Sequence, residues 1–237
     1  MNRIKAIFCD NEGCISPGKG LPFPLRDFIR LRELFNACPG VDFSVCTGRS
    51  VPYVEGLVQA LDLLNSTIPC VCEGGAVLYW PKSDRWEALS SLSDKEELLR
   101  FLRPDSYRVE PGKVACLSLY AAEKFTLEEL YRAITEGSTP GAYNITMSAV
   151  AVDVTPSGID KGYGVQEACR RVSISLSEVL CIGDSTNDMP MLKIGGYSAC
   201  PRNATAEVKK SVDFVAPSES TRGLLEILEH FRPHFVT

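Results

Sequence analysis

The sequence predicts an α/β protein whose parallel sheet, with helices on both faces, carries a smaller inserted α+β domain. Short β-branched runs alternate with amphipathic segments before residue 81 and again after residue 154, and this alternation implies a parallel sheet. Between these two parts the order of strands and helices changes. We therefore expect a core domain of residues 1–80 and 155–237 and an inserted domain of residues 81–154.

The first part of the core predicts a strand–helix repeat that ends in a hairpin. Pro52 falls in the first turn of an expected helix, where its missing N–H costs little. Gly74 and Gly75 separate the two strands of the hairpin. The expected elements are strands at residues 4–9, 41–46, 67–72 and 76–80, and helices at residues 25–34 and 54–61.

The inserted domain and the last part of the chain continue the pattern. Ser93 with Glu96, and Thr126 with Glu129, have the spacing of capping boxes, so each pair predicts the start of a helix. We expect strands at residues 114–120, 143–147 and 149–154 in the insert. The second part of the core predicts strands at 179–182, 197–200 and 212–215, and helices at 165–172 and 224–231.

Composition excludes several classes of function. The 237 residues are 45% hydrophobic and 23% charged, as in soluble globular proteins. The net charge of −5 gives no reason to expect nucleic acid or an anionic membrane as partner. No run approaches the ~20 apolar residues of a membrane span, and from the first residues we expect no secretory signal. The sequence indicates no particular oligomeric state.

The ten cysteines are expected to be reduced and structural. They form no CxxC pair, and the chain has only two histidines to complete a zinc site. Cys9, Cys46 and Cys181 lie in or at the end of apolar strand-like runs. Reduced thiols favour a cytoplasmic location.

Four polar segments each follow an expected strand. The carboxyl ends of parallel strands meet at one crevice, so residues far apart in sequence can come together there. Taken singly, each segment has a simpler explanation, such as a turn cap for Asp10 or Asp184 and a solvated cation for Lys161. The segments contribute Asp10 and Glu12, then Thr47, Gly48 and Arg49, then Lys161, and finally Asp184, Asn187 and Asp188.

Together these residues favour a magnesium and phosphate site. Asp10, Glu12, Asp184 and Asp188 would repel one another unless protons or a cation neutralise them, and carboxylate oxygens suit Mg²⁺. Phosphate oxygens can be bound by the Thr47 hydroxyl and by neighbouring backbone N–H groups, including that of Gly48. Lys161, at the start of a helix, adds positive charge. A carboxylate beside a metal and a lysine is the arrangement used for aspartyl-phosphate chemistry.

The four segments, in this order, resemble the haloacid dehalogenase superfamily. The superfamily pattern is strand-DxDG, strand-[ST]G, a lysine and strand-GDxxxD, and residues 183–188 are the most specific match. Thr47-Gly48-Arg49, Lys161-Gly162 and Asn203-Ala204 resemble its Cof-like sugar-phosphate phosphatases and the related phosphoglycolate, sucrose-phosphate and mannosyl-phosphoglycerate phosphatases. The resemblance implies a Rossmann-like core, with the insert as a cap that sets specificity.

The resemblance also implies a role for each residue. Asp10 would attack phosphorus, and Glu12 would protonate the leaving oxygen and then activate water. The Asp10 side chain, the Glu12 backbone carbonyl and Asp184 would hold Mg²⁺, supported by Asp188. Arg49, Asn187, Asn203 and Glu73 are expected near the substrate or the catalytic residues.

Two positions depart from the superfamily pattern, and one further motif is rejected. Glu12 stands where aspartate is usual, and it keeps a carboxylic acid with one more methylene. Glu73 stands where Cof-like members often have asparagine; it could bind a hydroxyl or a cation, or be a solvated turn residue. Residues 13–20 approach a nucleotide-binding P-loop, but Gly20 replaces the required hydroxyl.

We expect a magnesium-dependent phosphatase acting on a small phosphorylated metabolite, such as a sugar phosphate or phosphoglycolate. A phosphomutase would share the aspartyl-phosphate step and return the phosphoryl group to its substrate. A metal- and phosphate-binding regulatory protein without turnover is a third hypothesis, and Glu12 is its only support.

Overall fold

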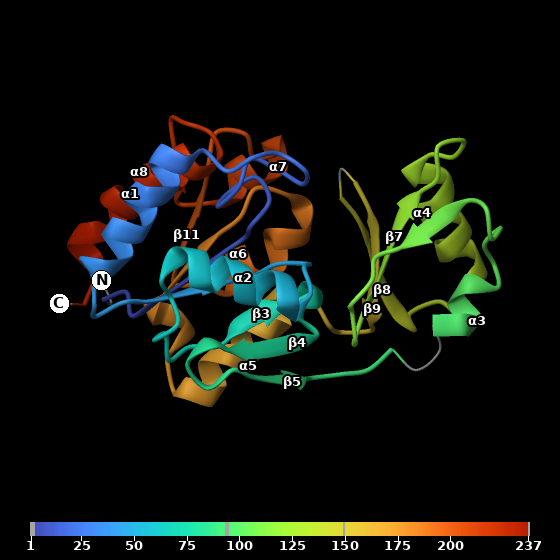
Figure 1. Ribbon diagram of the computed structural model, residues 1–237, viewed down its shortest axis with the longest axis horizontal. Helices are drawn as coiled ribbons and strands as arrows, with labels where there is room; N and C mark the ends of the chain where they lie inside the picture. The colour runs from blue at the N-terminus through green and yellow to red at the C-terminus, as the bar shows by residue number, and fades with distance from the viewer. Residues whose placement is uncertain (1–2, 93–94, 149, 237) are drawn as a thin grey trace.

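The protein is described by a computed structural model that covers residues 3–92, 95–148 and 150–236. Two lobes lie side by side (Figure 1). One lobe holds both chain ends and a sheet flanked by helices. The other holds the segment from β6 (Tyr107–Val109) to β9 (Val152–Pro156), together with α3 (Lys95–Leu99) and α4 (Leu127–Gly137). We call these lobes the core and the cap.

The core contains a five-stranded parallel sheet in the order β12-β11-β10-β1-β2. The central strand, β1, pairs with β2 on one side and with β10, from the far end of the sequence, on the other. The chain order therefore reverses beside β1, which is where α/β sheets bind ligands. The strands are β1 (Ala6–Cys9), β2 (Asp42–Val45), β10 (Val179–Ile182), β11 (Tyr197–Cys200) and β12 (Phe214–Val215).

Helices bury both faces of this sheet, which explains why β1 is apolar at every position. Ala6 and Phe8 belong to one buried cluster, whereas Ile7 and Cys9 belong to another. The first cluster includes residues of α5 (Lys161–Val172), α6 (Met189–Ile194) and α7 (Ala206–Ser211). The second includes residues of α1 (Leu25–Asn36), α2 (Val51–Leu61) and α8 (Ser220–Phe231). Continuous burial is typical of parallel strands.

A small antiparallel sheet of three strands, which contains the expected hairpin, follows the second helix. Its strands are β3 (Cys70–Cys72), β4 (Val77–Trp80) and β5 (Arg85–Ala88), and a bridge from Cys46 to Val71 joins it to the main sheet. The sequence pattern did not predict β5, because most of its residues are exposed and carry no apolar alternation. Since β5 pairs with β4, the hairpin extends past residue 80. The division into residues 1–80 with 155–237 and residues 81–154 stays a prediction.

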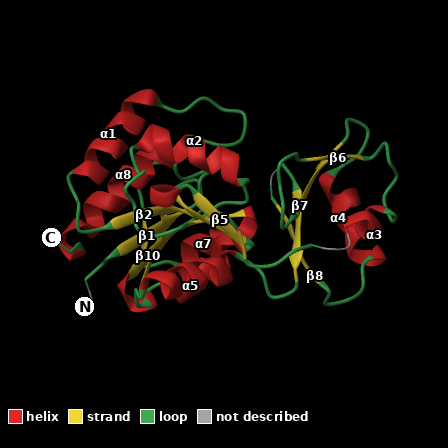
Figure 2. Cartoon of the chain, turned by 60° about the horizontal axis from the view of Figure 1, so that its bottom comes forward, coloured by secondary structure: helices red, strands yellow, loops and turns green. Residues whose placement is uncertain are grey.

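The cap is an antiparallel sheet in the order β6-β7-β9-β8, covered on one face by α3 and α4 (Figure 2). In β7 (Leu117–Ala121), Leu117 and Leu119 point into the cluster under the helices, so Ser118 and Tyr120 lie on the opposite face. Val152 and Val154 flank Asp153 in the same way. β8 (Tyr143–Met147) completes the sheet. Figure 1 shows that the face without helices is turned toward the core.

The predicted fold class, a parallel α/β core with an inserted α+β domain, is confirmed. Pro52 lies in the first turn of α2, and Thr126 and Glu129 form the expected capping box on α4. Ser93 lies outside the described residues, as does residue 149, where a strand was expected to begin. In the described part of the chain, no helix has the length and apolar character needed to cross a membrane.

Helix α1 provides a matched test of the core. Leu31 is fully buried in the cluster with α8, whereas Leu25 is 71% exposed. Leu31→Ala should lower the free energy of unfolding by about 2–5 kcal/mol, because it removes buried methyl groups and leaves a cavity. Leu25→Ala should change it by less than about 0.5 kcal/mol. Urea unfolding followed by circular dichroism measures both, and equal losses would contradict this account of the core.

Candidate active site

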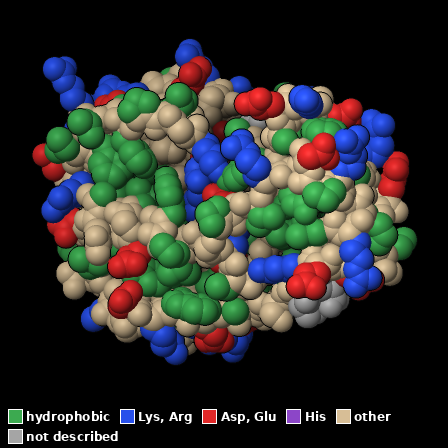
Figure 3. Space-filling model, turned by 45° about the vertical axis from the view of Figure 1, so that its right-hand side comes forward, with side chains coloured by type: hydrophobic (Ala, Val, Ile, Leu, Met, Phe, Trp, Pro, Cys, Tyr) green, Lys and Arg blue, Asp and Glu red, His purple; other side chains and the backbone are tan. Residues whose placement is uncertain are grey.

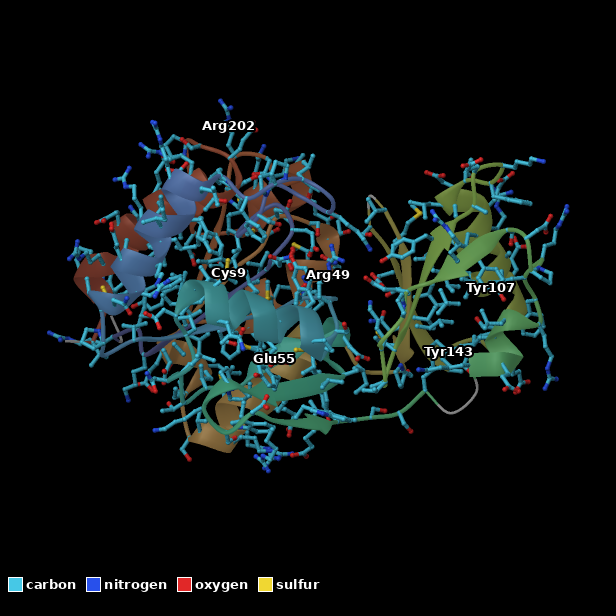
Figure 4. The ribbon with its side chains drawn as sticks, viewed as in Figure 1. Cys9, Arg49, Glu55, Tyr107, Tyr143 and Arg202 are labelled. Atoms are coloured by element: carbon cyan, nitrogen blue, oxygen red, sulfur yellow. The ribbon has the colours of Figure 1, made fainter. Side chains whose placement is uncertain are left out.

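The candidate site lies at the carboxyl ends of β1 and β10. Asp10 follows β1 directly, and Asp184 follows β10 after one glycine. Because these strands are neighbours, residues far apart in sequence meet here. Figure 4 shows Cys9, at the end of β1, inside the core, and Arg49 on the side of the core that faces the cap. The site is therefore open toward the cap.

Lys161 joins two of the predicted carboxylates. Its Nζ lies 2.8 Å from Asp10 Oδ1 and 2.5 Å from Asp188 Oδ1. All three residues are at most 4% exposed. Lys161 is the first residue of α5, whose N-terminus is capped by Asp160 through the Tyr163 N–H. The start of the helix thus places the ammonium group between the two acids.

Asp188 organises the loop that carries Asp184. Its Oδ2 accepts hydrogen bonds from the backbone N–H groups of Asp184 and Ser185, both at 2.9 Å. A Cβ on Gly183 would lie 2.4 Å from the Cβ of Asp188, so only glycine fits before the loop. These contacts explain the Gly-Asp spacing of the motif.

The Asp184 carboxylate lies against the loop that follows β1. Asn203 Nδ2 donates to Asp184 Oδ2 and to the carbonyl oxygen of Gly13, both at 3.0 Å. Gly13 has a φ of +84°, and a Cβ there would lie 2.0 Å from Asp184 Oδ2. Gly13 is therefore required by both its backbone conformation and its closeness to Asp184.

The buried acids are short of positive charge. Oxygen atoms of Asp10, Asp184 and Asp188 all lie within 4.8 Å of one another. Burial raises the pKa of Asp184 to about 7, with a further rise from Asp188, although Lys161 and Asn203 lower it. Burial also raises the pKa of Asp10, and Lys161 opposes that shift. A divalent cation would supply the missing charge, and these oxygen donors suit Mg²⁺.

Glu12 is held at the edge of the site. Arg49 Nε donates to Glu12 Oε1 at 2.5 Å, and the Thr47 hydroxyl donates to Glu12 Oε2 at 3.4 Å. Thr47 also accepts the Arg49 backbone N–H at 3.2 Å. The segment after β2 therefore positions the Glu12 carboxylate, and Gly48 from the same segment lines the cavity beside it.

The cavity between core and cap has a volume of 380 Å³. It contains most of the predicted site residues and several cap residues that the sequence did not indicate. Its core lining includes Asp10, Glu12, Gly48, Arg49, Lys161, Asp184, Asn187 and Asn203, and its cap lining includes Glu110, Lys113, Tyr120 and Asp153. Thr47 and Asp188 lie buried behind this lining.

Four charged residues of the cavity were not indicated by the sequence, one of them Asp153 on β9. Lys19 lies in the segment rejected as a P-loop, and Glu110 and Lys113 lie between β6 and β7. Surface loops of most proteins carry such residues, so nothing in their spacing marks them as part of a site. Only the placement of the cap over the core brings them to the cavity.

Glu73 has a different environment from the expected ones. It is 1% exposed and accepts hydrogen bonds from three consecutive cap N–H groups, those of Val114, Ala115 and Cys116, at 2.8–3.1 Å. The alternative of a solvated turn residue is therefore wrong, because the carboxylate is buried. Glu73 binds the cap chain to the core immediately after Lys113.

Comparisons with known proteins agree with this geometry. The family model of haloacid dehalogenase-like hydrolases matches residues 105–228. A phosphoglycolate phosphatase from Aeropyrum pernix is 31% identical, and the match covers 95% of this chain and 92% of that protein. A crystal structure from Thermoplasma acidophilum has a TM-score of 0.83 at 22% identity, covering 98% of this chain and 99% of that one. A HAD/COF-like hydrolase from Plasmodium vivax has a TM-score of 0.79 at 19% identity, covering 98% and 96%.

The fold and the site define a hydrolase with an acidic centre at the carboxyl edge of a parallel sheet. The chain belongs to the haloacid dehalogenase-like hydrolases. The resemblance of the four motifs to this superfamily is confirmed, and so is the predicted enzyme class, a phosphatase.

The contacts of Glu73 give a prediction about the joint between core and cap. Glu73→Gln keeps the size of the side chain but loses the charge that three N–H groups share. The free energy of unfolding should fall by about 1.5–3 kcal/mol, the contribution of hydrogen bonds to a charged group. Hydrogen exchange at Val114, Ala115 and Cys116 should also become faster. Glu123→Gln, at an exposed position of the cap, is the control and should leave both quantities unchanged.

Proposed function

We propose that this protein is a Mg²⁺-dependent phosphatase that hydrolyses a small phosphorylated metabolite through an aspartyl-phosphate on Asp10. The observation that carries the proposal is the meeting of Asp10, Asp184 and Asp188 around Lys161. The name of the Aeropyrum pernix relative favours a phosphoglycolate-like substrate over a sugar phosphate. A cytoplasmic location stays a prediction.

Asp10 is the proposed nucleophile. Its Oδ1 is paired with Lys161, so the second carboxylate oxygen remains to attack phosphorus. Lys161, together with the N–H groups of the segment containing Thr47 and Gly48, would bind the phosphate oxygens. As the Asp10 oxygen bonds to phosphorus, the ester oxygen leaves and takes a proton from the Glu12 carboxyl group.

The same two residues would complete the second half of the reaction. The Glu12 carboxylate, now without its proton, accepts a proton from water. The water oxygen bonds to phosphorus, the bond to Asp10 breaks, and phosphate leaves with the Asp10 carboxylate restored. Arg49 and Thr47 support this role, because their contacts hold Glu12 beside the cavity.

The residues proposed to hold Mg²⁺ are Asp10, Glu12, Asp184 and Asp188. Asp188 would act mainly by support, because its own oxygens already contact Lys161 and the backbone of its loop. When bound, the ion would neutralise charge on the phosphate and the clustered carboxylates. The cap would restrict entry of water and choose the substrate.

The nucleophile assignment can be tested by substitution. Asp10→Asn should abolish Mg²⁺-dependent phosphate release from phosphoglycolate and from p-nitrophenyl phosphate, because the amide is a poor nucleophile. The phosphate that stays covalently bound to the protein after acid quenching should also disappear. The activity of a mock preparation is subtracted as background. Sustained turnover by this variant above that background would contradict the assignment.

The acid–base assignment predicts a different loss. Glu12→Gln should reduce kcat by about 10²–10⁴-fold, the usual contribution of a positioned acid–base group. With p-nitrophenyl phosphate, whose leaving group needs no proton, the phosphorylation step should suffer less than with phosphoglycolate. Rapid-quench measurements of the first turnover compare the two substrates. Identical losses of that step for both would argue against Glu12 as the acid.

Metal removal provides a third test. Dialysis against EDTA should remove activity, and Mg²⁺ should restore it. Asp184→Asn should raise the Mg²⁺ concentration needed for half-maximal activity, because a charged oxygen donor is lost. Ser211→Ala, at the exposed last residue of helix α7, is the control and should leave that concentration unchanged. Full activity after EDTA treatment would contradict the metal requirement.

A further inference from the structure

A second cluster of charged residues lies in the cavity, apart from Asp10. Three cations converge on the single carboxylate of Glu110, a cap residue. Lys19 Nζ and Arg49 Nη1 each lie 3.2 Å from Glu110 Oε1, and Lys113 Nζ lies 3.0 Å from Oε2. All four side chains line the cavity that contains Asp10 and Lys161. In Figure 3, Lys and Arg side chains gather between the two lobes.

The cations come from separate parts of the fold. Lys19 belongs to the loop after β1, Arg49 follows β2, and Lys113 precedes β7 in the cap. The Lys113 side chain is only 3% exposed, so it is a buried charge. It is fixed by hydrogen bonding to Ser118 and lies 3.6 Å from Asp153 Oδ1. Burying a lysine is costly unless its charge is compensated. The burial of Lys113 among these partners therefore indicates a specific role for its charge.

Tyr120 adds an unused polar group to the same place. Its ring lies 3.7 Å beneath the Lys19 ammonium group, and it lines the cavity. Its hydroxyl is buried and has no hydrogen-bond partner among the described residues. A buried hydroxyl without a partner costs free energy that a ligand can recover. The cluster therefore has a free polar group beside its cations.

We infer that Lys19, Arg49 and Lys113 form a subsite for a carboxylate on the substrate, and that the Glu110 carboxylate stands in for that group in the free enzyme. The substrate class is then a small phosphate ester of a hydroxy acid. This inference rests on the proposed phosphatase function, since the subsite shares its cavity with Asp10. It assigns the recognition of the acid to residues outside the four motifs.

The charges explain why a carboxylate is favoured. Glu110 contacts all three cations, while Arg49 also pairs with Glu12 and Lys113 also lies near Asp153. Glu110 is itself 17% exposed and can turn toward solvent. A substrate carboxylate replacing it keeps the cations neutralised and also reaches Tyr120. A neutral hydroxyl in that position could not neutralise them, so Glu110 would remain in place and occupy the subsite. Sites built for a polar group discriminate against analogues that lack it.

The test compares two esters that differ only in this group. Phosphoglycolate carries the carboxylate, and 2-hydroxyethyl phosphate carries a neutral hydroxymethyl group instead. Lys113→Met removes the charge and keeps the length of the side chain. The ratio of kcat/KM for phosphoglycolate to that for hydroxyethyl phosphate should fall about 10- to 100-fold, since a charged hydrogen bond is lost. Lys19→Met should lower the ratio in the same direction.

Two variants sharpen the result. Glu110→Gln removes the competing carboxylate, so KM for phosphoglycolate should fall severalfold while KM for hydroxyethyl phosphate does not. Lys124→Met, on the exposed surface of the cap, is the matched control and should leave the ratio unchanged. If Lys113→Met lowers kcat/KM equally for both esters, the cluster is only a structural joint between cap and core, and the inference is overturned.

Binding separates this inference from the proposed function. Calorimetry with Asp10→Asn measures the affinity for each ester without turnover, and circular dichroism checks that each variant is folded. If no ester is hydrolysed but Lys113→Met still weakens phosphoglycolate binding at least tenfold more than hydroxyethyl phosphate binding, the proposed function fails and the subsite stands. Equal weakening in this background overturns the subsite whatever the activity.

Discussion

The site depends on one buried interaction, the Lys161 ammonium group held between Asp10 and Asp188. Burying these charges is tolerable only because each has a partner, and removing one partner of such a group typically costs about 3–5 kcal/mol. The surrounding backbone fits this requirement closely. A Cβ on Gly75 would lie 1.9 Å from the Asp160 carbonyl oxygen, so the hairpin packs directly against the start of α5. The hairpin, the helix and the sheet edge thus fix Lys161 together.

The same electrostatic logic extends from the core into the cap. In the cavity wall, Lys19 and Arg49 of the core and Lys113 of the cap are paired with the acids Glu12, Glu110 and Asp153. Glu73 holds the cap chain just after Lys113, so a core residue sets the position of a cap cation. The polar face of the cap sheet is therefore part of the site. Its apolar face packs under α3 and α4.

Sequence patterns predicted the elements that are apolar and periodic, and they failed where an element is short or exposed. Strands β1 and β10 of the core sheet are continuous apolar runs, so their positions could be predicted. β5 and β6 have mostly exposed residues, and they exist because a neighbouring strand supplies their hydrogen bonds. The environment of Glu73 was also unreadable, since its partners are backbone N–H groups about forty residues away.

The sequence by itself determined the fold class, the four motifs and the superfamily. These features are local in the sequence. They are acids at the ends of strands, a glycine next to an acid, and a lysine at the start of a helix. The tertiary structure alone decided which charges share the cavity, because that depends on how the cap lies over the core. The nucleophile could thus be named from residues near one strand. The partners of Glu110 could not, because Lys19, Arg49 and Lys113 come from three separate segments and meet only in the folded chain.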